Sequence, residues 1–176
     1  MRNKLIAFVT LSVLLAASLL SAQDVKRTSK LPALTGGFDT AAYGYVREIQ
    51  GMRIGASLST DGSTLALAIE APTTGWVAIG LGSLFMNGAY IVMGADGGNP
   101  KVIVQQGQGH HHGDVANKVL ASLVKTNGVN TVLQFNIPAA PFVQDGTLKM
   151  IIAYGRSTDM RSYHATHASL QLSVQS

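Results

Sequence analysis

The chain has 176 residues, of which 47% are hydrophobic and 12% charged, and it contains no cysteine. This length predicts one domain that can bury a core without cross-links, and the lack of cysteine excludes disulfides and a thiol nucleophile. The formal charge is +4, but no cluster of Lys and Arg is interleaved with aromatic residues. The sequence therefore lacks the basic pattern that is typical of nucleic-acid binding.

The first 22 residues have the pattern of a secretory signal. Arg2 and Lys4 precede an apolar run over residues 5–20, and the small residues Ser21 and Ala22 follow it. This order is typical of signal peptides, and the run is shorter than the roughly 20 residues that span a bilayer. We therefore expect cleavage after Ala22, a mature chain without a membrane anchor, and a periplasmic or secreted location.

The next segment, residues 23–37, is polar and basic, and we expect it to be a flexible lead-in to a single domain over residues 38–176. That domain begins with a hydrophobic period of two over residues 52–58 and again over residues 65–69. Asp61-Gly62 lies between the two alternating segments, and this combination is typical of a β-hairpin.

The segments that follow are short and either apolar or alternating. Residues 75–82 and 89–95 are apolar on both faces, which suits central buried strands. Residues 115–125 are ambiguous between a strand and a short helix. Further strands are expected at 101–105, 129–137, 148–154 and 170–174, and loops at 83–88, 107–114 and 155–161. The pattern predicts an all-β fold, an immunoglobulin-like antiparallel β-sandwich of roughly eight to ten strands.

Side chains that could carry catalysis are few. The carboxylates are mostly at expected turns, and no Gly-x-Ser-x-Gly motif occurs. The Gly-rich stretch 94–98 joins one strand to another, whereas a dinucleotide site needs a strand followed by a helix. The sequence therefore predicts a protein that is not an enzyme by itself.

One methionine stands apart from the others. Most methionines in such a chain fill the core, and Met52, Met93 and Met150 fit this role because each lies within an apolar strand. Met86 lies instead in the loop 83–88 between two buried strands, where a large apolar side chain needs something to pack on. From the residues alone, core filling and ligation of a metal both remain open for Met86.

The region around Met86 resembles the signature of DOMON domains, a family that includes the cytochrome domain of cellobiose dehydrogenase. The resemblance is carried by the block Gly75-Trp76-Val77-Ala78-Ile79-Gly80, the loop with Met86, and Gly88-Ala89-Tyr90-Ile91-Val92-Met93-Gly94. It extends from Phe38-Asp39 to the last strand, with a late Ala153-Tyr154 strand, a loop and a His before that strand. It implies a sandwich whose two sheets can enclose a ligand, which in the cytochrome-type members is haem b held by one Met and one His.

Carried over to this chain, the resemblance implies Met86 and His164 as the haem ligands. Residues two apart in a strand share a face, so extending the core-facing Leu170 and Leu172 backwards puts His164 on the inner face and His167 on the outer face. A core imidazole bonded to a backbone carbonyl is the alternative for His164. Trp76, Phe85 and Tyr90 would line the pocket or belong to the ordinary core.

The expected function follows from that ligand pair. Because the chain has no cysteine, haem b would be held without covalent bonds, and Met/His ligation leaves no open position on the iron and raises its potential. The resemblance thus implies one-electron transfer with an unidentified extracytoplasmic redox partner, or haem carriage. Sugar-binding and purely structural DOMON domains lack the pair, and family members often place a Gly and a basic residue after the final His, where this chain has His167 and Ala168.

A second metal site is the remaining candidate. His110, His111 and His112 are adjacent in an expected loop flanked by glycines, and Asp114 follows. Because neighbouring side chains of an extended segment alternate sides, His110 and His112 with Asp114 could bind Zn, Cu or Ni while His111 points away. A solvated polar loop, or a contact of this loop with a haem edge, is the alternative.

Overall fold

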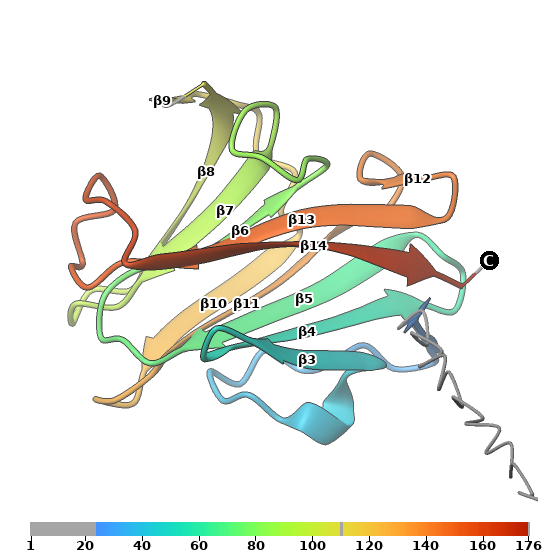
Figure 1. Ribbon diagram of the computed structural model, residues 1–176. Helices are drawn as coiled ribbons and strands as arrows, with labels where there is room; N and C mark the ends of the chain where they lie inside the picture. The colour runs from blue at the N-terminus through green and yellow to red at the C-terminus, as the bar shows by residue number, and fades with distance from the viewer. Residues whose placement is uncertain (1–23, 110, 176) are drawn as a thin grey trace, which may run out of the picture.

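The computed structural model describes residues 24–109 and 111–175, which form a sandwich of two β-sheets (Figure 1). The expected β-sandwich is confirmed. All strand pairs are antiparallel except β1 with β14 and β2 with β4, so both sheets are mixed. The described residues contain 14 strands rather than eight to ten, because several pairings involve only two or three residues. The expected signal peptide, residues 1–22, lies outside the described residues.

The larger sheet has the strand order β1-β14-β13-β6-β7-β8-β9, with β12 paired to β13, and the smaller has the order β10-β11-β5-β4-β2, with β3 paired to β4. The strands of the larger sheet are β1 (Asp24–Val25), β6 (Val77–Leu81), β7 (Tyr90–Ala95), β8 (Lys101–Gln108), β9 (His111–Gly113), β12 (Val143–Gln144), β13 (Thr147–Tyr154) and β14 (Thr166–Val174). Those of the smaller sheet are β2 (Arg27–Thr28), β3 (Tyr45–Ile49), β4 (Met52–Ser59), β5 (Thr64–Ala71), β10 (Ala121–Thr126) and β11 (Thr131–Pro138). A 3-10 turn, η1 (Thr40–Ala42), precedes β3.

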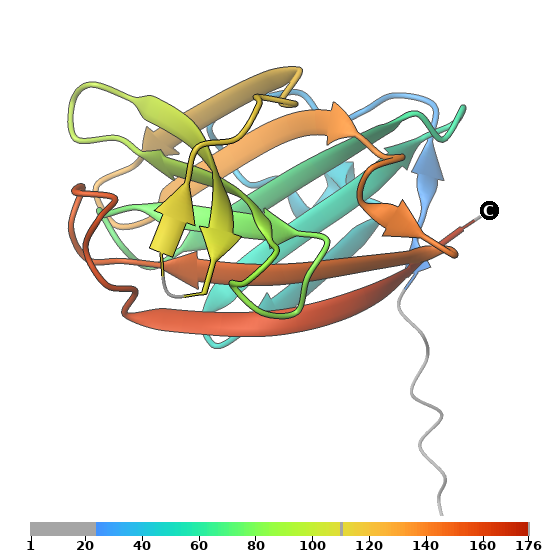
Figure 2. The same cartoon turned by 90° about the horizontal axis from the view of Figure 1, so that it is seen from above.

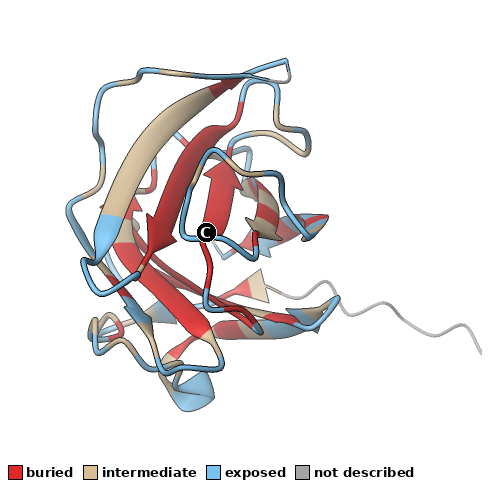
Figure 3. Cartoon of the chain, turned by 90° about the vertical axis from the view of Figure 1, so that its left-hand side faces the viewer, coloured by how far each residue is buried: buried red, intermediate tan, exposed pale blue. Residues whose placement is uncertain are grey.

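The core lies between the two sheets, and buried residues concentrate in the strands (Figure 3). In β14 the side chains of Ala168, Leu170, Leu172 and Val174 are buried while their neighbours are more exposed. Strands β6 and β7 are buried along their whole length, as expected for central strands covered on both faces. The period-two pattern thus identified which side chains of the last strand face the core.

The segment expected to be a flexible lead-in is part of the sandwich over its described residues. β1 pairs with β14 in the larger sheet, and β2 pairs with β4 in the smaller sheet. Val25 is fully buried. The start of this polar segment thus satisfies backbone groups by adding to the edges of the two sheets.

Two other local predictions change. The expected loop 107–114 is mostly the β8–β9 hairpin, in which Gly107 pairs with His112. The ambiguous segment 115–125 contains no helix: residues 115–120 have no regular secondary structure, and β10 begins at Ala121, at the edge of the smaller sheet. Within the part of the chain that the structure describes, no helix has the length and hydropathy that crossing a membrane requires.

Candidate functional site

The β6–β7 loop (residues 82–89), which carries Met86, is folded over the outer face of the larger sheet. On one side the Gly88 N–H donates to the carbonyl of Gly107 at 3.0 Å. On the other side the Ser169 hydroxyl donates to the carbonyl of Leu84 at 2.8 Å. Figure 2 shows the loop (green) beside the β8–β9 hairpin (yellow). The loop is therefore held between β8 and β14 instead of extending into solvent.

A second apolar cluster lies beneath this loop, separate from the core between the sheets. We call it the outer-face cluster. Its buried members are Trp76, Ala78, Ala89, Ile91, Met93 and Ala95, and Met86, Ile103, Ile151, Ala153 and Met160 pack against it. The partly buried Met86 thus packs on an apolar surface although it lies in a loop.

The outer face is lined by small residues where the loop approaches it. Ala153 pairs with Ala78 across β13 and β6, and a Cβ added to Gly80 would lie 2.6 Å from the Ile151 side chain. A Cβ added to Gly107 would lie 1.8 Å from the Met86 carbonyl oxygen. Glycine at Gly107 is therefore required for the loop to come this close to β8.

The imidazole of His112 contacts the Met86 side chain. Its Nε2 is 3.3 Å from the Met86 sulfur, and its Nδ1 is 2.8 Å from Oε1 of Gln105. An amide oxygen can only accept, so Nδ1–H donates to Gln105, and in the neutral ring Nε2 keeps its lone pair. Burial lowers the pKa of His112 below its ordinary value, which favours this neutral form.

Two further histidines lie at the β14 side of the same face. His167 pairs with Ala153 and so shares the face of the outer-face cluster. His164 lies in the β13–β14 loop (residues 155–165), is exposed, and its ring centroid is 4.5 Å from that of His167. Partial desolvation of the ring, and then the charge of His167, lower the pKa of His164 below its ordinary value. The expected inner-face position of His164 is wrong, because β14 begins at Thr166 and the alternation does not extend past it.

The three aromatic residues that were expected near the ligand lie in different places. Trp76 belongs to the outer-face cluster, and its Nε1–H donates to the Ser162 hydroxyl at 3.0 Å, which ties the β13–β14 loop to the sheet. Phe85, next to Met86, is 74% exposed. Tyr90 lies on the opposite face of its strand, in the core between the sheets, with its ring 5.3 Å from that of Phe142. The structure therefore does not bring Tyr90 together with Met86.

The expected second metal site is only partly described. His110 lies outside the described residues. His112 faces Met86 and Gln105, and Asp114 is exposed. Among residues 24–109 and 111–175, no three His, Asp or Glu side chains gather where they could hold a metal ion. The contact between Met86 and His112 was not expected, because 26 residues of chain separate the two.

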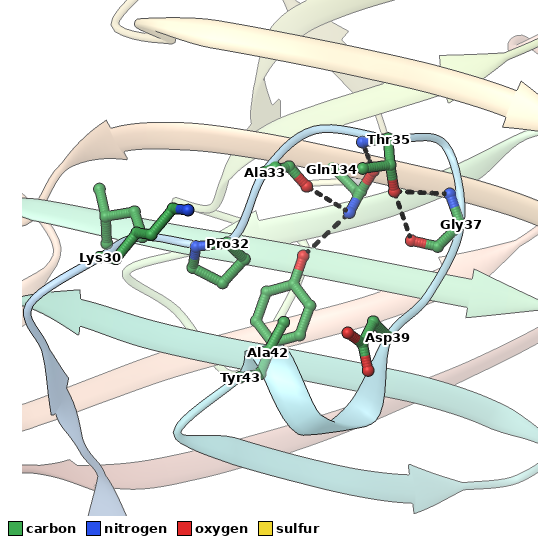
Figure 4. Close-up of a pocket in the computed structure, with 10 residues that line it drawn as sticks. Lys30, Pro32, Ala33, Thr35, Gly37, Asp39, Ala42, Tyr43 and Gln134 are labelled. Carbon is green, nitrogen blue, oxygen red and sulfur yellow. Dashed lines mark hydrogen bonds between the residues drawn. The ribbon is translucent and has the colours of Figure 1, made fainter.

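A cleft of about 300 Å³ lies on the other side of the molecule, between residues 30–43 and the smaller sheet (Figure 4). Gln134 lies at its base. Its Oε1 accepts from the N–H groups of Thr35 (2.9 Å) and Gly36 (2.8 Å), and its Nε2 donates to the Tyr43 hydroxyl at 3.1 Å. Because these bonds satisfy the buried amide internally, we assign no ligand to this cleft.

Comparisons with known proteins support the fold. No protein-family model matches the sequence, and no curated protein matches it. The cytochrome b domain of pyranose dehydrogenase from Coprinopsis cinerea is similar in structure, with a TM-score of 0.56 and 15% identity over 69% of this chain and 76% of that chain. The cytochrome domain of Myriococcum thermophilum cellobiose dehydrogenase has a TM-score of 0.57 and 12% identity over 70% and 75%.

A third similar structure is a family 9 carbohydrate-binding module from Caldicellulosiruptor kristjanssonii in complex with glucose. Its TM-score is 0.53 with 8% identity, over 86% of this chain and 95% of that chain. At these identities the likeness concerns the fold. The chain thus has the β-sandwich fold of the cytochrome domains of pyranose dehydrogenase and cellobiose dehydrogenase, the architecture that its resemblance to cytochrome-type DOMON domains implied.

Proposed function

We propose that the protein binds haem b without covalent bonds on the outer face of the larger sheet, with Met86 and His164 as axial ligands. The observation that carries the proposal is the position of Met86, which holds a thioether over an apolar surface on the face that also presents the imidazoles of His112, His164 and His167. In cytochromes, a thioether and an imidazole form the axial ligand set that raises the iron potential.

The residues of this face fit a flat apolar group. The outer-face cluster is apolar, and the small side chains of Ala78 and Ala153 pair within it. When bound, the iron would supply reversible one-electron chemistry. The chain's own contribution is to hold Met86 through the bonded β6–β7 loop and to position His164 through the contact of Trp76 with Ser162.

The proposed role is one-electron transfer to a redox partner outside the cytoplasm, or haem carriage, by a protein that is not an enzyme alone. The cytochrome domains that share the fold support this role. The expected signal peptide supports an exported location. N-terminal sequencing of the protein from its host should find a chain that starts near Gln23.

Visible spectra of the haem-reconstituted protein and three variants test the ligand pair. The wild-type protein should show low-spin bands. His164→Ala should lose them, and Met86→Leu should give five-coordinate, high-spin haem at a lower potential, because each removes one axial donor. His167→Ala is the matched control and should keep the wild-type spectrum. Loss of the bands in His167→Ala with a normal His164→Ala spectrum would assign the ligand to His167 instead.

Carbohydrate binding is the second candidate function, because a glucose-binding module shares the fold. Two aromatic side chains beside the site support it, since Phe85 is 74% and Tyr163 is 97% exposed, and such rings can stack on sugars. Calorimetric titration with soluble oligosaccharides separates the two functions. Tight binding by a colourless protein that takes up no haem would favour the carbohydrate module.

A further inference from the structure

The contact between Met86 and His112 brings two electron-pair donors together. Because Nδ1–H of His112 donates to Gln105, the neutral ring has a lone pair on Nε2, and this lone pair faces the Met86 sulfur at 3.3 Å. A thioether sulfur has no proton to donate. Two electron-pair donors at this distance can both bind a single cation that lies beside them.

The separation of the two donors fits one small metal ion. With bonds of about 2.0 Å to nitrogen and about 2.3 Å to sulfur, a donor separation of 3.3 Å corresponds to an angle of about 100° at the metal. Donors on opposite sides of a haem iron would instead lie about 4.3 Å apart, the sum of the same two bonds. The observed pair is therefore arranged as neighbouring ligands of an ion and not as the two axial ligands of a haem.

The donors also indicate which ion. Thioether ligands select Cu(I), and imidazole accepts copper as well. Metal-bound histidines commonly donate their second ring N–H to an acceptor that fixes the tautomer and the ring orientation. Gln105 accepts from His112 in this way. No carboxylate is part of the pair, so it lacks the oxygen ligands that Mg²⁺ or Ca²⁺ require.

We propose that Met86 Sδ and His112 Nε2 form a Cu(I) site at the β8 side of the outer face, oriented by Gln105. The site shares His112 with the one expected over His110, His112 and Asp114, but Met86 takes the place of the other two ligands, and the thioether narrows the expected Zn, Cu or Ni to Cu(I). Water or a small exogenous ligand completes the coordination. Met86 cannot serve Cu(I) and haem at the same time, so the Cu(I) site belongs to the haem-free protein.

The test is an anaerobic competition in which haem-free protein is titrated into Cu(I) held by the chromophoric chelator bicinchoninate. The wild-type protein should withdraw one equivalent of Cu(I). Met86→Leu and His112→Ala should each lower the affinity at least about tenfold, and Gln105→Leu should lower it by about 10–100-fold, the usual effect of removing an outer partner. The matched controls Met160→Leu and His111→Ala should retain wild-type affinity, because Met160 packs on the same cluster and His111 belongs to the same strand.

X-ray absorption spectra of the wild-type Cu(I) protein provide a readout that does not depend on any variant folding. The proposal expects a sulfur shell at about 2.3 Å together with a nitrogen shell. A shell of nitrogen and oxygen only, a wild-type protein that withdraws no copper, or equal losses in His111→Ala and His112→Ala would each overturn it. Because the titration uses haem-free protein, these outcomes do not test haem binding, which the visible spectra of the reconstituted protein test separately.

Discussion

At the scale of single residues, the position of Met86 depends on Gly107. A Cβ at Gly107 would lie 1.8 Å from the Met86 carbonyl oxygen, which is a backbone atom that cannot turn away. The β6–β7 loop must therefore move if any side chain is added there. The residue thus links the packing of β8 to the geometry of both proposed sites.

We expect Gly107→Ala to reduce the free energy of unfolding by about 1–3 kcal/mol, the usual cost of overpacking, and to weaken both haem and Cu(I) binding by displacing Met86. Urea unfolding and the two binding measurements check this. Gly37→Ala is the control, because the nearest atom to its added Cβ is 3.8 Å away. Unchanged binding in Gly107→Ala would show that Met86 is positioned independently of β8.

At the scale of elements, the β4–β5 hairpin has a turn that is organised by one carboxylate. The Ser63 N–H donates to Asp61 Oδ1 at 3.0 Å, and the hydroxyls of Ser59 and Ser63 also donate to this carboxylate. These hydrogen bonds, the one from Ser59 first, lower the pKa of Asp61 from 3.8 to about 2. The Asp-Gly signal in the sequence correctly identified this hairpin, and Gly62 adopts a positive φ of 74°.

The depressed pKa of Asp61 predicts a pH dependence of stability. The folded pKa lies below the unfolded value, so the contribution of Asp61 is complete above pH 3.8 and is lost as the pH falls towards 2. Asn at this position keeps an acceptor oxygen but has no charge to titrate. We therefore expect Asp61→Asn to reduce the fall in urea midpoint between these pH values. If the urea midpoints of the two proteins instead fall equally over this pH range, the turn does not stabilise the charged form of Asp61.

At the scale of the whole molecule, the first described residues connect the two sheets. β1 adds to β14 in one sheet, and two residues later β2 adds to β4 in the other. The Lys26 carbonyl between them accepts from the Leu58 N–H at 3.1 Å. This short segment therefore covers an edge of each sheet, and exposed strand edges promote aggregation.

We expect Val25→Ala to lower the free energy of unfolding, because the side chain is fully buried. The loss should not exceed about 3 kcal/mol, the upper value for burying a whole aliphatic side chain. Deleting residues 23–28 should lower this free energy further and promote association through the uncovered edges. Chemical unfolding and light scattering provide the measurements, with Lys26→Ala as the exposed control. A truncated protein that stays monomeric and equally stable would show that the segment is dispensable.

The sequence by itself determined the all-β class, the β4–β5 hairpin and the buried faces of β6, β7 and β14. These features are local, because alternation within one strand and a turn signal between two strands need only a few consecutive residues. The short motif around Trp76 and Met86 also led to a fold that the structural comparisons confirm.

Only the tertiary structure decided which side chains meet Met86. The parity of β14 could not place His164, since the strand begins at Thr166 and the loop before it has no fixed period. Tyr90 and Ile91 are neighbours in sequence but lie on opposite faces of the larger sheet. His112 reaches Met86 because β9 folds back on β8 and the β6–β7 loop crosses the same face. Such contacts depend on the pairing of distant strands, which no local pattern encodes.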